Sequence, residues 1–181
     1  MTHLAGLMDM GTLDAQRNEI AMNNQPLEIK VAIQIQKPVN LVFEVIVDPS
    51  MMDKYFISKS NGRMEEGKTL VWQFPEFDMD VPIQVGKIVR DQLISYSWST
   101  EGNKHLTEMT LKAAKNDSTI VTITEKSIDN IRIDKLNGTI NWLKGNTEGW
   151  ANFLACLKAY LEYGINLRKG AFDFLSSTDS T

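Results

Sequence analysis

The stretch from Asn146 to Gly164 reads N-T-E-G-W-A-N-F-L-A-C-L-K-A-Y-L-E-Y-G, and it decides the fold. Its large apolar residues recur at the spacing of one helical face: Trp150, Phe153, Leu154, Leu157 and Leu161. Asn146 or Thr147 is expected to cap this helix, and Gly164 to end it. A stripe with two large aromatic residues needs a broad apolar surface to cover. The segments before it supply that surface.

Upstream of the helix, apolar and polar residues alternate along a series of short segments, which predicts strands. The first is Leu27–Gln36, and the others are Thr69–Phe74, Val81–Ile88, Ile94–Ser99, His105–Leu111 and Thr119–Glu125. The alternation changes phase at Gly86, which predicts a β-bulge there. Short turns separate most of these strands, so consecutive strands are expected to pair in antiparallel fashion.

Two short helices are predicted between the first strand and the rest of the sheet. Pro38 opens the first, which runs through Ile46. Asp48-Pro49 breaks the helical pattern, and Ser50 is expected to cap a second helix over Met51–Phe56. Residues Ser127–Gly138 show no periodicity and are predicted to form an irregular loop before the last helix.

The chain is expected to contain one domain. Residues 1–26 lack steady periodicity and are interpreted as an appendage, with a short helix possible over Leu13–Asn24. Residues 27–166 hold the strands and helices of the domain. Residues 167–181 end in Ser, Thr and Asp and are predicted to be a tail.

Composition narrows the classes of function. The net charge is −4 and no basic stripe is present, which argues against nucleic-acid binding. No apolar run has the length of a membrane span, and no secretory signal is evident at the N-terminus. The single cysteine, Cys156, cannot form an internal disulfide, so a cytoplasmic location is expected.

The order of predicted elements resembles the START-like (SRPBCC, helix-grip) superfamily. Within it, the chain is similar to the branch named after the activator of the ninety-kilodalton heat-shock chaperone ATPase. The residues that carry the resemblance are Pro38 with Val42-Phe43, Asp48-Pro49, Gly86, Ile94–Trp98, Thr119–Glu125, and Gly149-Trp150 with Phe153-Leu154 and Leu157. The resemblance implies an α+β fold in which a curved antiparallel sheet wraps around the long C-terminal helix.

The resemblance does not imply one activity. The superfamily includes lipid carriers, cyclases, hormone receptors and chaperone regulators. In this chain Tyr55-Phe56-Ile57 stands where many relatives have a tryptophan and then a proline, at positions that rim the cavity in those relatives. The shape of the cavity mouth is therefore expected to differ.

One set of residues is expected to point between the sheet and the helix. It consists of Trp72, Phe74, Tyr96, Trp98, His105, Met109, Trp150 and Leu154. Two interpretations stay open: these side chains fill an ordinary core, or they line an apolar pocket in which the polar atoms of Tyr96 and the tryptophans orient a ligand.

Other kinds of site receive little support. Gly62–Thr69 matches the phosphate-loop pattern, but a strand follows it instead of the helix that phosphate binding requires. With two histidines in the chain, His3 and His105, a transition-metal site is not expected, and no cofactor is predicted. An acid–base pair inside the cavity would need His105 and Glu125, the two candidates for catalysis.

Three hypotheses follow. The first is non-catalytic binding of a small hydrophobic or amphipathic, lipid-like molecule between the sheet and the C-terminal helix. The second is a protein-interaction module that regulates a chaperone ATPase and uses an exposed docking patch. The third is a cyclase-like or isomerase-like enzyme. A continuous cavity of a few hundred Å³ beside Trp150 favours the first over the second.

Overall fold

The computed structural model describes residues 27–100, 103–128 and 136–176. Its elements are, in order, β1 (Glu28–Ile35), α2 (Val39–Val47), α3 (Pro49–Met52), β2 (Lys59–Ser60), β3 (Thr69–Phe74), β4 (Phe77–Val89), β5 (Leu93–Thr100), β6 (Asn103–Ala114), β7 (Ser118–Ser127), α4 (Leu136–Tyr163) and α5 (Asp173–Ser176). The helix expected over Leu13–Asn24 lies outside the described residues. The α+β helix-grip architecture is confirmed.

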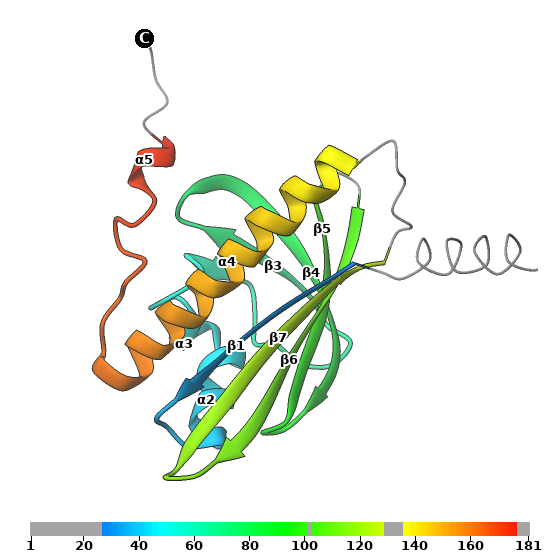
Figure 1. Cartoon of the computed structure of the whole chain (residues 1–181). Coiled ribbons are helices and arrows are strands. Elements are labelled where there is room, and N and C mark those ends of the chain that lie inside the picture. Colours follow the sequence, from blue (N-terminus) through cyan, green and yellow to red (C-terminus); the bar gives the residue numbers. More distant parts are fainter. Residues whose placement is uncertain (1–26, 101–102, 129–135, 177–181) are drawn as a thin grey trace, which may run out of the picture.

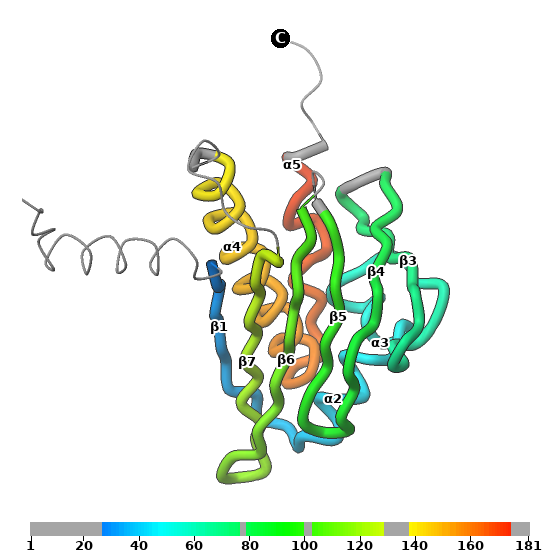
Figure 2. Tube along the Cα trace, turned by 90° about the vertical axis from the view of Figure 1, so that its right-hand side faces the viewer, coloured from blue at the N-terminus to red at the C-terminus, as the bar shows by residue number. Residues whose placement is uncertain are grey.

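The strands form one antiparallel sheet in the order β1-β7-β6-β5-β4-β3-β2. Helix α4 crosses one face of this curved sheet diagonally (Figure 1). Figure 2, turned by 90°, shows α4 and the segment after it on the same side of the sheet. Strand β1 pairs with β7, so α2 and α3 carry the chain across to the opposite edge, where β2 and β3 lie.

The alternation read from the sequence corresponds to a buried and an exposed face of the sheet. In β6 the residues His105, Thr107, Met109 and Leu111 are buried under α2 and α4, and those between them are less buried. Tight turns connect β4 with β5 and β6 with β7. Asp91, Asn116 and Asp117 have positive φ angles there, which suits the twist of an antiparallel hairpin.

The predicted bulge at Gly86 is confirmed, because the pairing of β4 with β5 shifts register between Val85 and Ile88. A Cβ atom at Gly86 would lie 2.7 Å from the Oγ of Ser95. A larger residue at Gly86 would therefore require the Ser95 side chain, which donates to the Lys87 carbonyl, to move.

The second short helix differs from the prediction. It covers Pro49–Met52 instead of Met51–Phe56, and Asp48 caps it in place of Ser50. The Asp48 carboxylate accepts hydrogen bonds from the backbone N–H and the hydroxyl of Ser50, at 2.9 and 2.7 Å. Because a proline already has the φ angle of a first helical turn, the helix begins at Pro49. Its early end leaves Phe56 free to turn inward.

The C-terminal helix is longer than predicted. It begins at Leu136, so Asn146 and Thr147 lie inside it and do not cap it. The segment up to Gly138 was predicted as loop because glycines and polar residues weaken the helical pattern there. Tertiary contacts compensate: the ring of Trp142 stacks on His105 with centroids 5.2 Å apart. The predicted end is confirmed, since Gly164 has φ +68° and donates its N–H to Tyr160.

Residues Gly62–Thr69 form a turn that leads into β3, as predicted. Lys68 pairs with Glu65 at 2.8 Å within this turn. Gly67 has φ +81°, a backbone conformation that favours glycine. No helix N-terminus follows the described turn, so its amides do not converge as in a phosphate loop.

Candidate functional site

A cavity of about 500 Å³ lies between the sheet and α4. Strands β3, β4 and β5 provide one side of it, α4 the other, and the segments around Phe56 and Arg168 the rim. Its aromatic lining consists of Phe56, Trp72, Phe74, Tyr96, Trp98 and Trp150. The apolar lining continues along β4 with Met79, Val81, Pro82 and Ile83.

Five of the eight residues predicted from the sequence line this cavity: Trp72, Phe74, Tyr96, Trp98 and Trp150. They come from β3, β5 and α4, and alternation along each strand turns them to one face of the sheet. The structure therefore brings these five together. That they contact a ligand stays a prediction.

The other three predicted residues lie beside the cavity and not on its surface. His105 is 2% exposed and is stacked on Trp142. Met109 and Leu154 are 1% and 2% exposed and belong to the packed core. A residue that shares a sheet face with a cavity residue does not necessarily line the cavity, because the cavity between sheet and helix ends toward the middle of the sheet.

Phe56 is a lining residue that the sequence pattern did not single out as part of the cavity set. Its ring meets Phe74 edge-on at 5.3 Å, Trp72 at 5.9 Å and Phe153 at 4.6 Å between centroids. The family resemblance implied that Tyr55-Phe56-Ile57 lies at the cavity rim, and this was the one feature of the sequence that pointed to Phe56. Phe56 connects the sheet side of the cavity to the helix side.

Two glycines of α4 border the cavity opening. Gly145 and Gly149 both line it, and both are exposed. A Cβ atom built at either position would meet nothing within 4 Å. The helix therefore leaves open space here that larger side chains would occupy.

A buried carboxylate lies directly behind the aromatic wall. Glu125 is 0% exposed, and its Oε2 accepts hydrogen bonds from the indole N–H groups of Trp98 at 3.1 Å and Trp150 at 3.0 Å. The Thr107 hydroxyl donates to the same oxygen at 2.9 Å, and the Asn146 amide donates to Oε1 at 2.6 Å. This network fixes both indole rings at the cavity surface.

Three polar atoms of the lining residues have no hydrogen-bond partner among the described residues. They are Nε1 of Trp72, the hydroxyl oxygen of Tyr96 and Nε of Arg168. Burial raises the pKa of Tyr96 well above its ordinary value, and the charge of Glu125 raises it further, so the phenol stays neutral. Because an unsatisfied buried donor is costly, a ligand group or water that reached these atoms would be stabilising.

The segment after α4 passes over the cavity rim, and we refer to residues 164–173 as the strap. Its Arg168 donates to Glu76 at 2.8 Å, and the two side chains are only 13% and 7% exposed. The guanidinium carbon lies 5.4 Å from the centre of the Phe56 ring and 5.8 Å from that of Phe74. Arg168 therefore joins the strap to the aromatic lining.

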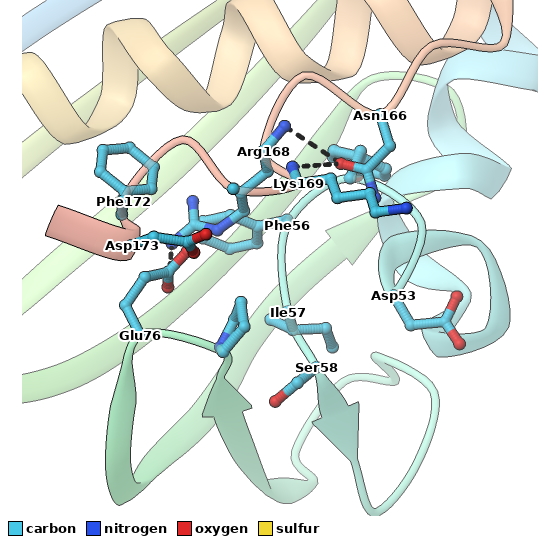
Figure 3. A pocket seen from close by; sticks show the side chains of 13 residues that line it. Asp53, Phe56, Ile57, Ser58, Glu76, Asn166, Arg168, Lys169, Phe172 and Asp173 are labelled. Atoms are coloured by element: carbon cyan, nitrogen blue, oxygen red, sulfur yellow. Dashed lines mark hydrogen bonds and ion pairs between the residues drawn. The ribbon is translucent and has the colours of Figure 1, made fainter. Parts of the chain in front are cut away.

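A smaller hollow of about 310 Å³ lies on the outer side of the strap (Figure 3). Arg168, Phe172 and Glu76 lie together on one side of it, and Asp53 lies on the other. The ring of Phe172 is 5.1 Å from the Arg168 guanidinium. Arg168 and Phe56 line both spaces.

Among the described residues, no three or more His, Cys, Asp or Glu side chains are grouped so as to hold a metal ion. None of the helices in the described ranges is both long enough and apolar enough to cross a membrane. Cys156 is buried, and burial raises the pKa of its thiol.

Comparison with solved structures places the fold among known ones. SSP2350 from Staphylococcus saprophyticus is 32% identical, with a TM-score of 0.66 over 78% of this chain and 96% of that chain. The Aha1 dimer from Colwellia psychrerythraea contains a chain 19% identical, with a TM-score of 0.62 over 76% of this chain and 98% of that one. DynU16, a protein of the dynemicin biosynthetic locus, is 21% identical, with a TM-score of 0.65 over 76% of this chain and 48% of that chain.

A search of curated protein sequences returned no significant match. The family model described as "Activator of Hsp90 ATPase homolog 1-like protein" matches residues 36–162, which run from the end of β1 almost to the end of α4. The matched region contains the aromatic lining, Glu125 and most of the sheet. The chain belongs to the family of Activator of Hsp90 ATPase homolog 1-like proteins.

Proposed function

We propose that the protein binds a small hydrophobic or amphipathic molecule in the aromatic cavity without transforming it. The observation that carries this proposal is the cavity itself, about 500 Å³ in volume and lined by six aromatic side chains. Ligand sites in proteins are typically concave, mostly apolar and of this size. Burial of the ligand's apolar surface would supply most of the binding energy, at about 25 cal/mol per Å².

The position of the acid–base candidates is the reason for preferring binding to catalysis. Glu125 is fully buried and does not line the cavity, and His105 packs between Trp98 and Trp142. A general acid or base has to reach the substrate within hydrogen-bond distance. The enzyme hypothesis therefore receives no support from these two residues.

Regulation of a chaperone ATPase is the second candidate, and family membership favours it. The exposed apolar side chains Tyr163, Ile165 and Leu167, at 70%, 51% and 49% exposure, form the end of α4 and the start of the strap. They could serve as a docking patch. The continuous cavity beside Trp150 supports ligand binding more directly, so we place that function first.

The test uses the uncharged apolar dye N-phenyl-1-naphthylamine and the substitution Gly149→Leu. Leucine at this exposed position of the lining would extend into the opening, where nothing lies within 4 Å of its Cβ. We expect the dye affinity, measured by fluorescence titration, to fall by about tenfold or more. The free energy of unfolding should stay unchanged or rise by up to about 1 kcal/mol, since glycine is a poor helix former.

The matched control is Gly138→Leu, at another helical glycine with nothing within 4 Å and outside the cavity lining. It should leave dye affinity unchanged. If wild type fails to bind the dye, or if Gly149→Leu binds it as tightly as Gly138→Leu does, the cavity is not a ligand site. Stimulation of a chaperone ATPase by such a protein would then favour the second candidate.

A further inference from the structure

The cavity wall has a negative charge immediately behind it. Three of the four hydrogen-bond donors to Glu125 are themselves lining residues: Trp98, Asn146 and Trp150. One side-chain layer therefore separates the carboxylate from the space that a ligand would occupy.

No cation among the described residues pairs with this carboxylate. All four of its hydrogen-bond donors are uncharged. The two indole N–H groups and the Asn146 amide N–H can only donate, and Thr107 is the one partner whose hydroxyl could also accept. Three of the four partners therefore suit the carboxylate form, and no cation among the described residues serves as its counterion.

The charged residues that line the cavity do not cancel the negative charge of Glu125. They are Asp80 and Arg168. Arg168 forms an ion pair with Glu76 at 2.8 Å, which neutralises its charge. Asp80 accepts a hydrogen bond from the uncharged Gln73 side chain at 2.7 Å. Asp80 lines the cavity and Glu125 lies directly behind its wall, whereas Arg168, the one cation among the described lining residues, is already paired with Glu76.

The aromatic wall already accommodates a cation. The Arg168 guanidinium packs over Phe56 and Phe74, two of the lining residues. Aromatic faces attract cations through the negative potential of the ring, and tryptophan does so most strongly. Because Trp98 and Trp150 direct their N–H groups to Glu125, the positive edges of these indoles are turned to the carboxylate.

From these observations we infer that the cavity binds cationic amphiphiles, apolar molecules that carry an ammonium group, in preference to anionic ones of the same length. The inference rests on the proposed function, because it assigns the charge class of the ligand in the same cavity. Apolar burial would contribute equally to both ligands, so the field of Glu125 and the aromatic faces decides between them. Carboxylate amphiphiles such as fatty acids would meet repulsion.

The experiment displaces bound N-phenyl-1-naphthylamine from the full chain with decylamine or decanoate at pH 7, where the two carry opposite charges. Wild type should bind decylamine at least about tenfold more tightly than decanoate. At an effective dielectric constant of about 20 and a separation of about 12 Å, one unit charge favours the cation by about tenfold and disfavours the anion by about tenfold, relative to an uncharged ligand, so a tenfold ratio is a lower bound. In Glu125→Gln the preference should fall by about tenfold or more.

The matched control is Glu108→Gln. It removes the same unit of charge, but from a residue of β6 that alternates with the buried residues and so lies on the face of the sheet opposite the cavity. It should keep the wild-type preference, and a loss there equal to that in Glu125→Gln would show that net charge alone is responsible. Circular dichroism checks that Glu125→Gln folds. If Glu125→Gln does not fold, the ratio of decylamine affinity to decanoate affinity in wild type and in Glu108→Gln decides whether the cavity prefers cations.

The outcomes separate this inference from the proposed function. Dye binding with decanoate equal to or tighter than decylamine overturns the charge selectivity and leaves the ligand cavity standing. Absence of dye binding by wild type overturns both. A preference for decylamine that Glu125→Gln weakens and Glu108→Gln preserves supports the inference.

Discussion

Trp150 has two roles that can be separated by substitution. Its ring closes the helix side of the cavity, and its N–H donates to the buried Glu125 at 3.0 Å. Trp150→Ala removes both and should lower the free energy of unfolding by about 3–5 kcal/mol, as for other buried tryptophans. Trp150→Phe keeps a ring and removes the N–H, and should cost about 1–3 kcal/mol.

Urea denaturation of the two variants and wild type measures these losses. A Trp150→Phe midpoint within error of wild type would mean that the hydrogen bond to Glu125 adds nothing to stability. A Trp150→Ala loss no larger than that of Trp150→Phe would mean that the ring itself contributes little. Either result would contradict the described network.

Glu162 joins the end of α4 to the turn after β1 and gives stability a pH dependence. Burial raises its pKa, but the Gln36 backbone N–H at 2.7 Å and Lys158 at 2.5 Å outweigh this, so the pKa is lowered overall. A carboxyl group whose pKa is lower in the folded chain stabilises the fold above its unfolded-state pKa. That stabilisation is lost as the pH falls through the folded-state value.

Glu162→Gln should therefore lower the free energy of unfolding by up to about 1 kcal/mol at pH 7, a size typical of one partly screened interaction. Below the ordinary glutamate pKa of 4.5, the difference between variant and wild type should shrink. Denaturant titrations at pH 7 and at about pH 3 test this. The exposed Glu148 on the same helix serves as the control, since Glu148→Gln should show no such trend. A difference that grows in acid would refute the assignment.

At the scale of elements, we expect the strap to limit how fast the cavity releases a ligand. Gly164 ends α4, and the chain then turns so that Arg168 reaches Glu76 and the rings of Phe56 and Phe74. Figure 3 shows Arg168 beside Phe56 and Glu76, residues that are distant from it in sequence, at the edge of the smaller hollow. Arg168, whose side chain is 13% exposed, is the residue that joins the strap to the cavity rim.

Arg168→Met keeps the length of the side chain and removes its charge. We expect the bound dye to leave about five- to thirtyfold faster, because an ion pair and two cation–π contacts of together about 1–2 kcal/mol are lost. Stopped-flow displacement measures this rate. Lys169→Met, at the next residue, is the control and should not change it. An unchanged rate in Arg168→Met would show that the strap does not limit release.

The start of α4 was not predicted correctly from the sequence, whereas its end was. The stripe from Trp150 to Leu161 was sufficient to predict the helix and its end at Gly164. Its first turns carry Gly138 and Gly145 and have low intrinsic helicity, and contacts such as Trp142 on His105 stabilise them. A helix start that depends on a distant strand is not visible in local sequence.

On the scale of the whole molecule, α4 crosses one face of the curved sheet (Figure 1), and the cavity lies between α4 and strands β3, β4 and β5. Near β1, β6 and β7 the space is filled by residues such as Met109, Ile123 and Leu157, each at most 1% exposed. Toward β3 the same architecture leaves the cavity open. The domain boundaries at residues 26 and 166, and the cytoplasmic location, stay predictions.

The sequence by itself determined the strand alternation, the bulge at Gly86, the order of elements and the apolar stripe of the last helix. These features depend on local periodicity and on backbone chemistry, which neighbouring residues encode. It also identified five of the lining residues, because strand faces follow directly from alternation. It did not determine which parts of the inward face are packed and which are open.

That distinction was decided by the tertiary structure. Whether an inward-facing side chain fills space or borders it depends on the distance between sheet and helix, which residues far apart in sequence set together. The four hydrogen-bond donors to Glu125 come from segments that are distant in sequence. The same is true of the contacts that place Phe56 in the cavity wall and of the ion pair between Arg168 and Glu76. Local periodicity does not encode contacts between distant segments. The charge behind the cavity wall and the residues of its rim could therefore be identified only from the tertiary structure.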